Sequence, residues 1–232
     1  GYREAMTLPE QPKSMLVVGA GAIGCEFADF YQTIGSEVTL VKFLPRIVPN
    51  EDEEVSKQLE RSFKKKKMKI LTGSAVESAD LSGDKCQVSV KTPSGNETIT
   101  AEIILSAVGV TPNIGGIGLE KAGVNTMKRK VVVDEYYQTS VRNIFAIGDI
   151  VHGPALAHVA SSEGIICVEK IAGMETSPLD YGNIPSCTYT NPEIASVGMT
   201  EAAAKESGRE IRVGKFPFTA SGLLEIQGII GR

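Results

Sequence analysis

An apolar segment that runs directly into a glycine-rich turn constrains the fold of this 232-residue chain more than any other feature. Residues 15–18 are typical of a buried strand, and Gly19, Gly21 and Gly24 follow before a helical pattern over residues 25–34. A strand, a Gly-x-Gly-x-x-Gly turn and a helix in this order form the unit that holds a dinucleotide pyrophosphate in doubly wound α/β folds. The sequence therefore predicts an α/β fold with a dinucleotide site, against the alternative of a glycine turn that binds nothing.

The end of the next expected strand, residues 36–43, leaves the kind of nucleotide open. An NAD site usually has Asp or Glu about 20 residues beyond the glycines, where the carboxylate accepts hydrogen bonds from ribose hydroxyls. Here Lys42 holds that position. A lysine cannot accept those bonds but could pair with a 2′-phosphate, and Arg46 is close enough to contribute. Three interpretations stay open: an NADP site, an NAD site that tolerates Lys42, and a residue altered by error or engineering.

The composition excludes some classes of function. A hydrophobic content of 42% and a mean hydropathy near zero predict a globular protein with a substantial core, as one large or two smaller domains. The net charge of −4 gives no electrostatic reason to expect a nucleic acid partner. The lysine run 64–67 ends an expected amphipathic helix and is interpreted as a solvated face near a helix C-terminus. No segment is long and apolar enough to span a bilayer, and no signal-peptide pattern is present, so we expect no membrane partner and a cytoplasmic protein.

The cysteines and histidines do not form a recognisable metal or redox motif. Four cysteines lie far apart with no Cys-x-x-Cys pair, and the chain has two histidines. These residues are Cys25, Cys86, Cys167, Cys187, His152 and His158. We therefore expect no metal site. Cys25 is predicted to be a small packed residue, although a helix N-terminus can lower a thiol pKa.

Hydrophobic periodicity and turn signals predict the remaining elements. The first part of the chain alternates helix and strand and contains an antiparallel excursion: a crossover helix over 49–66 capped by Asn50, a strand over 68–71, a hairpin of 87–92 with 97–101, and a buried strand over 103–108. A second part has expected strands over 130–137 and 143–147 and a helix over 156–171. After a linker at 178–185, strands near 187–189 and 194–198, a helix over 201–206 and a segment over 211–218 suggest the start of an α+β domain.

Five sequence blocks, in this order and spacing, resemble the flavin-dependent disulfide oxidoreductases, and the dihydrolipoamide dehydrogenases most closely. The blocks are Gly-x-Gly-x-x-Gly-x-Glu at 19–26, Ser-Ala-Val-Gly-Val-Thr-Pro-Asn at 106–113, Ile-Phe-Ala-Ile-Gly-Asp at 144–149, Leu-Ala-His at 156–158 and Thr-Asn-Pro-Glu-Ile-Ala-Ser-Val-Gly-Met-Thr at 190–200. The resemblance implies a Rossmann-like three-layer nucleotide-binding domain, part of an FAD domain and the start of an α+β dimerisation domain. The implied boundaries are a lead-in at 1–13, the NAD-binding domain at 14–127, the returning part of the FAD domain at 128–180 and an incomplete dimerisation domain at 181–232.

The resemblance also implies an activity. Such an enzyme reoxidises protein-bound dihydrolipoamide, passing electrons through a redox disulfide and FAD to NAD+. It works as a homodimer, with lipoyl proteins of 2-oxo acid dehydrogenase complexes or of the glycine cleavage system as partners. Glutathione- or mercuric-type reductases using NADPH are the alternative within the class. A nucleotide-binding module without catalytic activity is the alternative outside it.

The site residues that the resemblance implies fall into two sets. The expected NAD set is Gly19, Ala20, Gly21, Ala22, Ile23, Gly24, Glu26, Lys42, Val76 and Gly109. The expected FAD set is Asp149, Leu156, Ala157 and His158. Glu26 would lie near the contact of flavin and nicotinamide, with a helix-start carboxylate as the simpler alternative. His158 is expected to pack near the flavin rather than to act as a base.

Several family features do not appear in this sequence. The FAD glycine motif and the Cys-x4-Cys disulfide would precede Gly1, the His-Pro…Glu acid–base pair would follow the chain, and residues 223–232 no longer resemble the family. We therefore expect an internal fragment without catalytic residues. Such a fragment would bind NAD(H) weakly at best and would not turn over alone.

Overall fold

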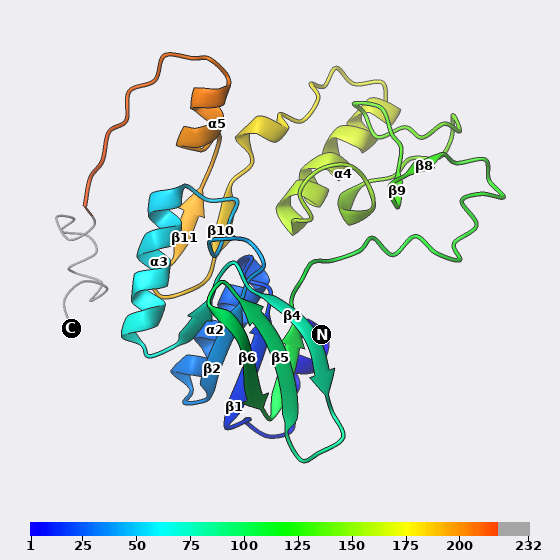
Figure 1. Ribbon diagram of the computed structural model, residues 1–232. Helices are drawn as coiled ribbons and strands as arrows, with labels where there is room; N and C mark the ends of the chain where they lie inside the picture. Colours follow the sequence, from blue (N-terminus) through cyan, green and yellow to red (C-terminus); the bar gives the residue numbers. More distant parts are fainter. Residues whose placement is uncertain (218–232) are drawn as a thin grey trace. The chain divides into compact units, whose positions relative to one another are not determined.

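The computed structural model describes residues 1–217 (Figure 1). The chain divides into two compact units, Gly1–Gly198 and Met199–Arg232. The predicted segment over 211–218 has no regular secondary structure through residue 217, whereas Phe218 and the tail at 223–232 lie outside the described residues.

The first unit is built on a parallel sheet in the order β3-β2-β1-β7. Its strands are β1 (Ser14–Val18), β2 (Glu37–Val41), β3 (Lys69–Leu71) and β7 (Ile103–Ser106). Two helices, α2 (Ala22–Thr33) and α3 (Glu53–Lys65), connect β1 to β2 and β2 to β3. Val18 pairs with Val41 on one side and with Ser106 on the other, so these three strands end together. The predicted parallel sheet with crossover helices is confirmed.

An antiparallel sheet is inserted before β7, in the order β4-β5-β6. It consists of β4 (Ala75–Asp80), β5 (Cys86–Thr92) and β6 (Gly95–Ala101). The predicted hairpin is β5 and β6, whereas β4 was not predicted. A register shift between Val76 and Ser78 breaks the alternation that would have marked a strand, and residues 77–80 are exposed.

Alternating side chains of β1 produce three layers. Met15 and Val17 enter a core cluster with side chains of α2 and α3, among them Ala28 and Phe63. Leu16 points to the opposite face and packs in a second cluster with residues of β5 and β6, such as Val88. Since successive side chains of a strand face opposite sides, helices cover one face of the parallel sheet and the antiparallel strands cover the other.

The chain start joins this core. Residues 2–5 form a short helix, α1 (Tyr2–Ala5), and Ala5 is buried. The Tyr31 hydroxyl on α2 donates a hydrogen bond to the Ala5 carbonyl. The expected lead-in therefore packs against the core of the first unit through Ala5, whereas residues 1–4 are exposed.

Two helix starts differ from their predicted positions. Helix α2 begins at Ala22, inside the glycine motif, with Gly21 as its N-cap residue. Helix α3 begins at Glu53 with Asp52 as N-cap, so Asn50 is not the cap. The Glu51 N–H closes a turn on the Val48 carbonyl at 3.0 Å, and the helical hydrogen bond from the Ser56 N–H to the Asp52 carbonyl follows it, so residues 49–51 form a turn before the helix.

Residues 124–198 contain less regular structure than expected. Elements here are β8 (Thr126–Met127), β9 (Lys130–Val131), a 3-10 turn η1 (Gly148–Ile150), α4 (Ala157–Ile171), a 3-10 turn η2 (Tyr181–Asn183), β10 (Ser186–Thr188) and β11 (Ile194–Ser196). The helix over 156–171 and the last two strands are confirmed. A strand over 143–147 is wrong, since only the single bridge of Gln138 with Phe145 occurs there.

The predicted strand over 130–137 is also largely wrong, for a local reason. The Asp134 carboxylate accepts hydrogen bonds from the backbone N–H groups of Tyr136 and Gln138, both at 2.9 Å. Tyr137 between them has a φ of 70°. This side-chain-capped turn competes with strand pairing, so regular pairing is confined to β9 and the isolated bridge of Val133 with Thr139.

In the second unit, helix α5 (Glu201–Glu206) matches the prediction. The Thr200 hydroxyl caps it by accepting a hydrogen bond from the Ala203 N–H at 3.2 Å. Within residues 1–217, no helix is both long and apolar enough to cross a membrane.

Candidate functional site

Two glycines of the turn after β1 are required by the packing of the protein itself. Gly19 has a φ of 107°, and a Cβ there would lie 2.3 Å from the Ala107 carbonyl oxygen. A Cβ at Gly24 would lie 1.8 Å from the Gly19 carbonyl oxygen. No side chain fits at either position, because backbone atoms of the turn and of the segment after β7 occupy the space.

Gly21 has no such internal reason to be glycine. Its φ of −80° is open to any residue, and no atom lies within 4 Å of a Cβ built there. It precedes the first turn of α2, where no side chain caps the free N–H groups and no acidic residue offsets the positive end of the helix. The helix start therefore opens into unoccupied space that suits an anionic phosphate.

The expected NAD residues meet at the carboxyl edge of the parallel sheet. The glycine turn follows β1, Lys42 follows β2, and Gly109, with a φ of 137°, lies three residues beyond β7. Within the turn, Ala20 is buried, whereas Ala22 and Ile23 are exposed on the first turn of α2. Ligands of open α/β sheets bind beyond the carboxyl ends of the strands, which is where these residues lie.

A hollow of about 670 Å³ continues this edge toward the antiparallel sheet. It is lined by Phe43, Gly73, Ala75, Lys91, Thr92 and Pro93. Phe43 adjoins Lys42 and Ala75 adjoins Val76, so two of the predicted residues flank the hollow. Phe43 is 75% exposed, which leaves an aromatic face accessible beside the edge.

The two cations near the end of β2 differ in their contacts. The Lys42 backbone is held between β3 and the following loop: its N–H donates to Leu71 and its carbonyl accepts from Ser74, at 2.8 and 2.9 Å. The Arg46 guanidinium donates to the Pro49 carbonyl at 2.7 Å. Arg46 is therefore already engaged by the protein.

Cys25 is a packed residue, as predicted. Its side chain is fully buried in the core beside the glycine turn. Burial raises the pKa of the Cys25 thiol to about 12, and the Lys42 charge offsets only part of this effect. The start of α2 therefore does not produce a reactive thiolate.

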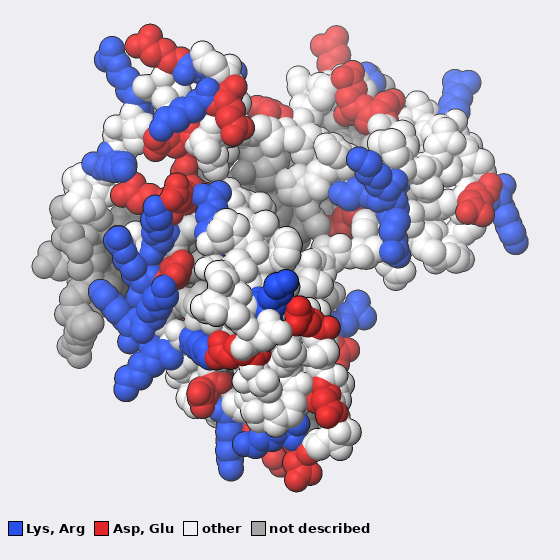
Figure 2. All heavy atoms as spheres, viewed as in Figure 1, with Lys and Arg blue, Asp and Glu red and all other residues white. Residues whose placement is uncertain are grey.

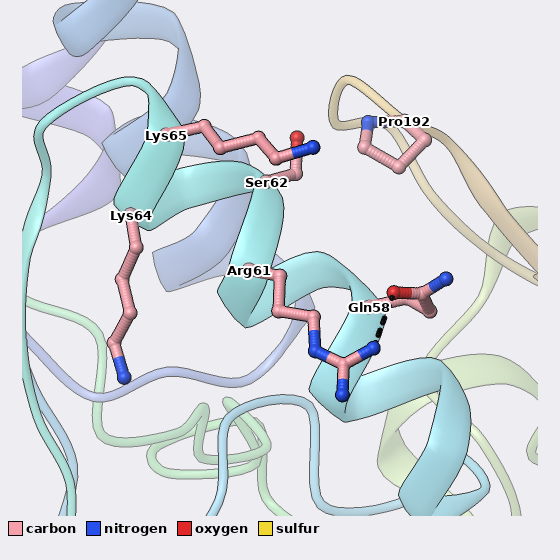
Figure 3. Close-up of a pocket in the computed structure, with 6 residues that line it drawn as sticks. All are labelled: Gln58, Arg61, Ser62, Lys64, Lys65 and Pro192. Atoms are coloured by element: carbon pink, nitrogen blue, oxygen red, sulfur yellow. Dashed lines mark hydrogen bonds between the residues drawn. The ribbon is translucent and has the colours of Figure 1, made fainter.

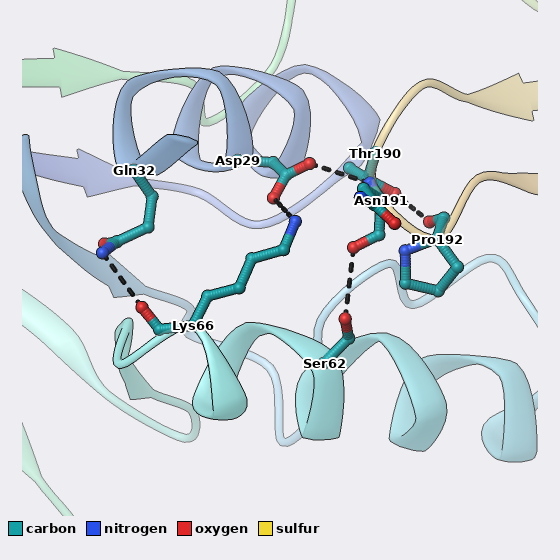
Figure 4. Close-up of polar contacts among 7 residues, drawn as sticks. All are labelled: Asp29, Gln32, Ser62, Lys66, Thr190, Asn191 and Pro192. Atoms are coloured by element: carbon teal, nitrogen blue, oxygen red, sulfur yellow. Dashed lines mark hydrogen bonds and ion pairs between the residues drawn. The ribbon is translucent and has the colours of Figure 1, made fainter. Parts of the chain in front are cut away.

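Helix α2 also carries two carboxylates that hold the segment after β10. Glu26 Oε1 accepts a hydrogen bond from the Tyr189 N–H at 2.8 Å. One helical turn later, Asp29 Oδ2 accepts from the Asn191 N–H at 2.8 Å (Figure 4). In the described residues, Glu26 thus binds backbone of the 189–191 segment, and Asp29 is a structural residue that the sequence analysis missed.

Asp29 is also the partner of one of the four consecutive lysines. The Lys66 ammonium lies 2.6 Å from Asp29 Oδ1, and Asp29 is only 6% exposed. The Ser62 hydroxyl donates to the Asn191 carbonyl at 3.1 Å. The Gln32 amide donates to the Lys66 carbonyl, also at 3.1 Å (Figure 4). The interpretation of residues 64–67 as a solvated face is therefore wrong for Lys66, which turns inward.

The remaining cations of α3 do line a solvated surface. Figure 2 shows Lys and Arg side chains gathered over this helix. A hollow of about 690 Å³ lies between α3 and the Asn191–Pro192 loop (Figure 3). Its lining residues are Gln58, Arg61, Ser62, Lys64, Lys65 and Pro192.

The expected FAD residues lie on η1 and at the start of α4. Asp149 is exposed on η1, after Gly148 with a φ of 76°. Leu156 is the N-cap residue of α4, and Ala157 and His158 are its exposed first residues. His158 Nε2 lies 3.0 Å from the Pro185 carbonyl oxygen, so its ring contacts the linker backbone.

Glu163 is a second residue that the sequence analysis missed. It is 1% exposed in the middle of α4. Its carboxylate accepts hydrogen bonds from the Gly148 N–H at 2.5 Å and from the Tyr181 hydroxyl at 2.6 Å. The available signal was a single carboxylate on the small, apolar face of a predicted helix. Among residues 1–217, no group of three or more His, Cys, Asp or Glu could hold a metal ion.

Comparison with known proteins places these features in a family. The family model described as pyridine nucleotide-disulphide oxidoreductase matches residues 2–164. The chain belongs to this family. The dimerisation-domain model of the pyridine nucleotide-disulphide oxidoreductases matches residues 184–228, so the predicted loss of resemblance after residue 222 is wrong for most of the tail.

Relatives within the pyridine nucleotide-disulphide oxidoreductases include dihydrolipoyl dehydrogenases. That of Rhizobium etli is 46% identical and covers 99% of this chain and 49% of its own length. The structure resembles that of LpdA from Mycobacterium tuberculosis, with a TM-score of 0.86, 27% identity and coverage of 95% of this chain and 48% of that one. The flavoprotein disulfide reductase RclA from Escherichia coli has a TM-score of 0.87, 26% identity and coverage of 96% and 51%. The chain spans about half the length of the curated relatives it matches.

Proposed function

We propose that this chain is the nucleotide-binding and initial dimerisation part of a dihydrolipoyl dehydrogenase. The whole protein would oxidise protein-bound dihydrolipoyl groups and pass the electrons through a redox disulfide and FAD to NAD+. The observation that carries the proposal is the turn at 19–24. Gly19 and Gly24 are required by packing, whereas Gly21 leaves open space in front of an uncapped helix start. Space of this kind is what a dinucleotide pyrophosphate needs.

The residues of the chain would bind and orient two cofactors, which supply the hydride chemistry when bound. The N–H groups at the start of α2 would hold the nicotinamide nucleotide through its phosphates. Gly109 would line the same edge, and Val76 would lie beside the adenine end, next to the hollow that exposes Phe43. Asp149 would accept hydrogen bonds from FAD, and its exposure on a glycine-led turn fits that role.

The proposed setting follows that of the dihydrolipoyl dehydrogenases. The protein would act as a homodimer in the cytoplasm, and the dimerisation-domain match supports the first of these points. Its partners would be lipoyl proteins of a 2-oxo acid dehydrogenase complex or of the glycine cleavage system. The redox disulfide and the His–Glu base would belong to parts of the protein outside this chain.

The direct test uses the full-length protein with free dihydrolipoamide. We expect reduction of NAD+, followed at 340 nm, together with flavin absorbance of the purified protein. Gly21→Ser is expected to lower the NAD+ affinity at least about tenfold, which corresponds to 1.4 kcal/mol. A protein that binds flavin but does not reduce NAD+ when dihydrolipoamide is supplied would exclude the proposed activity.

A second candidate function is favoured by Lys42. A glutathione- or mercuric-type reductase would use NADPH, and Lys42 would pair with its 2′-phosphate at the end of β2. On this hypothesis Lys42→Glu should weaken NADPH binding about tenfold or more and improve NADH binding, because it exchanges a cation for an acceptor of ribose hydroxyls.

The measurement is a titration of both nucleotides against the original protein and the variant, with Arg46→Gln as the matched control. Because Arg46 is already engaged by Pro49, we expect the control to change the ratio of the two affinities less than Lys42→Glu does. Stronger NADH than NADPH binding by the original protein would favour the dihydrolipoyl dehydrogenase and leave Lys42 as a tolerated residue.

A further inference from the structure

The turn that carries Asp149 is built around the buried carboxylate of Glu163. Helix α4 approaches this turn very closely: a Cβ at Gly148 would lie 3.3 Å from the Ala160 Cβ, and one at Gly164 would lie 3.2 Å from the Ile147 side chain. Small residues thus bring Glu163 within reach of the turn. One of its oxygens then accepts the Gly148 N–H at 2.5 Å.

The other oxygen of Glu163 reaches the far end of the same loop through Tyr181. The Tyr181 hydroxyl donates to Glu163 Oε1 at 2.6 Å, and the Tyr181 ring fills the space in front of Gly153, 2.6 Å from where a Cβ would stand. The Lys130 ammonium also donates to the Gly153 carbonyl at 3.3 Å. The loop 148–153 is therefore held at its first residue and at its last, and one carboxylate takes part in both contacts.

Glu163 belongs neither to the nucleotide turn nor to the expected FAD residues. A carboxylate that is 1% exposed is costly to bury, and hydrogen bonds to a charged acceptor are the compensation. Tyr137 adds a further layer, with its hydroxyl 3.3 Å from that of Tyr181. Burial and the neighbouring Glu163 raise the pKa of Tyr181, so the phenol keeps its proton and remains a donor to the carboxylate.

From this geometry we infer that Glu163 and Tyr181 are positioning residues, which hold the 148–153 loop so that the Asp149 carboxylate faces the flavin cofactor. The role rests on the proposed function as far as the cofactor is concerned. The holding of the loop itself rests only on the contacts of Glu163. Asp149 would touch the cofactor, whereas Glu163 and Tyr181 act through the backbone that carries it.

The test compares Glu163→Gln and Tyr181→Phe with Glu175→Gln, an exposed residue beyond the end of α4, in the full-length protein. Two properties are measured: amide hydrogen exchange of residues 148–153 in the protein freed of flavin, and the FAD dissociation constant by flavin fluorescence. Glu163→Gln is expected to speed exchange of the loop and to weaken FAD binding, each roughly tenfold, since a hydrogen bond to a charged acceptor is lost. Tyr181→Phe is expected to act in the same direction but less, because its ring still packs on Gly153.

The two readouts separate the inference from the proposed function. If the original protein binds no FAD, the proposed function fails, and loop exchange still tests the role of Glu163. If Glu163→Gln accelerates exchange throughout the protein, and no more in the loop than elsewhere, Glu163 is a general stability residue. The inference is then overturned. Loop exchange and FAD affinity equal to those of Glu175→Gln would overturn it as well.

Discussion

Gly24→Ser is expected to destabilise the protein by about 3 kcal/mol or more, whereas Gly21→Ser should leave its stability within about 0.5 kcal/mol. A Cβ at Gly24 would lie 1.8 Å from the Gly19 carbonyl oxygen, so α2 must move away from β1. Serine in place of a helical glycine gains only about 0.5 kcal/mol from propensity, which is too small to offset that displacement. At Gly21 no atom lies within 4 Å, and serine is a good N-cap residue.

The same pair of variants separates folding from binding. Gly21→Ser places a side chain where the phosphates would approach and offers an internal partner to the helix N–H groups, so nucleotide affinity should fall while the denaturation midpoint stays constant. Urea denaturation followed by circular dichroism and titration with NADH measure the two effects. An unchanged nucleotide affinity in a folded Gly21→Ser protein would argue that the turn binds nothing.

Asp29→Ala is expected to cost about 2–4 kcal/mol of stability. The substitution removes the partner of the Lys66 ammonium at 2.6 Å and the acceptor of the Asn191 N–H at 2.8 Å. Breaking a fully buried ion pair costs more, but the Lys66 side chain is 25% exposed and can reach water. Thermal or urea denaturation measures the loss.

Two further variants isolate the cause. In a double-mutant cycle with Lys66→Met, Asp29→Ala should cost less than it does alone, because the cation is already gone. The control Glu60→Ala removes the more exposed pair with Lys64 and should cost less than about 1 kcal/mol. Equal effects of Asp29→Ala and Glu60→Ala would show that the contacts of Asp29 contribute little.

The sequence predicted those parts of the fold whose physical cause is local. The glycine turn was identified because a strand, three glycines and a helix start follow one another in one short stretch, and the requirement at Gly24 is itself local, since a Cβ there would meet the Gly19 carbonyl. The β5–β6 hairpin and helix α4 were found for the same reason, since alternation and helical periodicity are properties of short windows. The predicted strand over 130–137 was largely wrong because the Asp134 turn competes with strand pairing.

Local sequence patterns do not show which groups the carboxylates of this chain contact. Glu26 was expected near the contact of flavin and nicotinamide, and nothing in its local sequence indicated that its oxygen meets the Tyr189 N–H, 163 residues away. Asp29 likewise meets Asn191 at a separation of 162 residues. Glu163 joins two segments, 15 and 18 residues distant in opposite directions. A buried carboxylate accepts whichever donor the returning chain brings to it, and that donor is chosen by the packing of helices and linkers. A ten-residue stretch of sequence therefore determines the nucleotide turn. The positions of the segments around the turn were decided only by the tertiary structure.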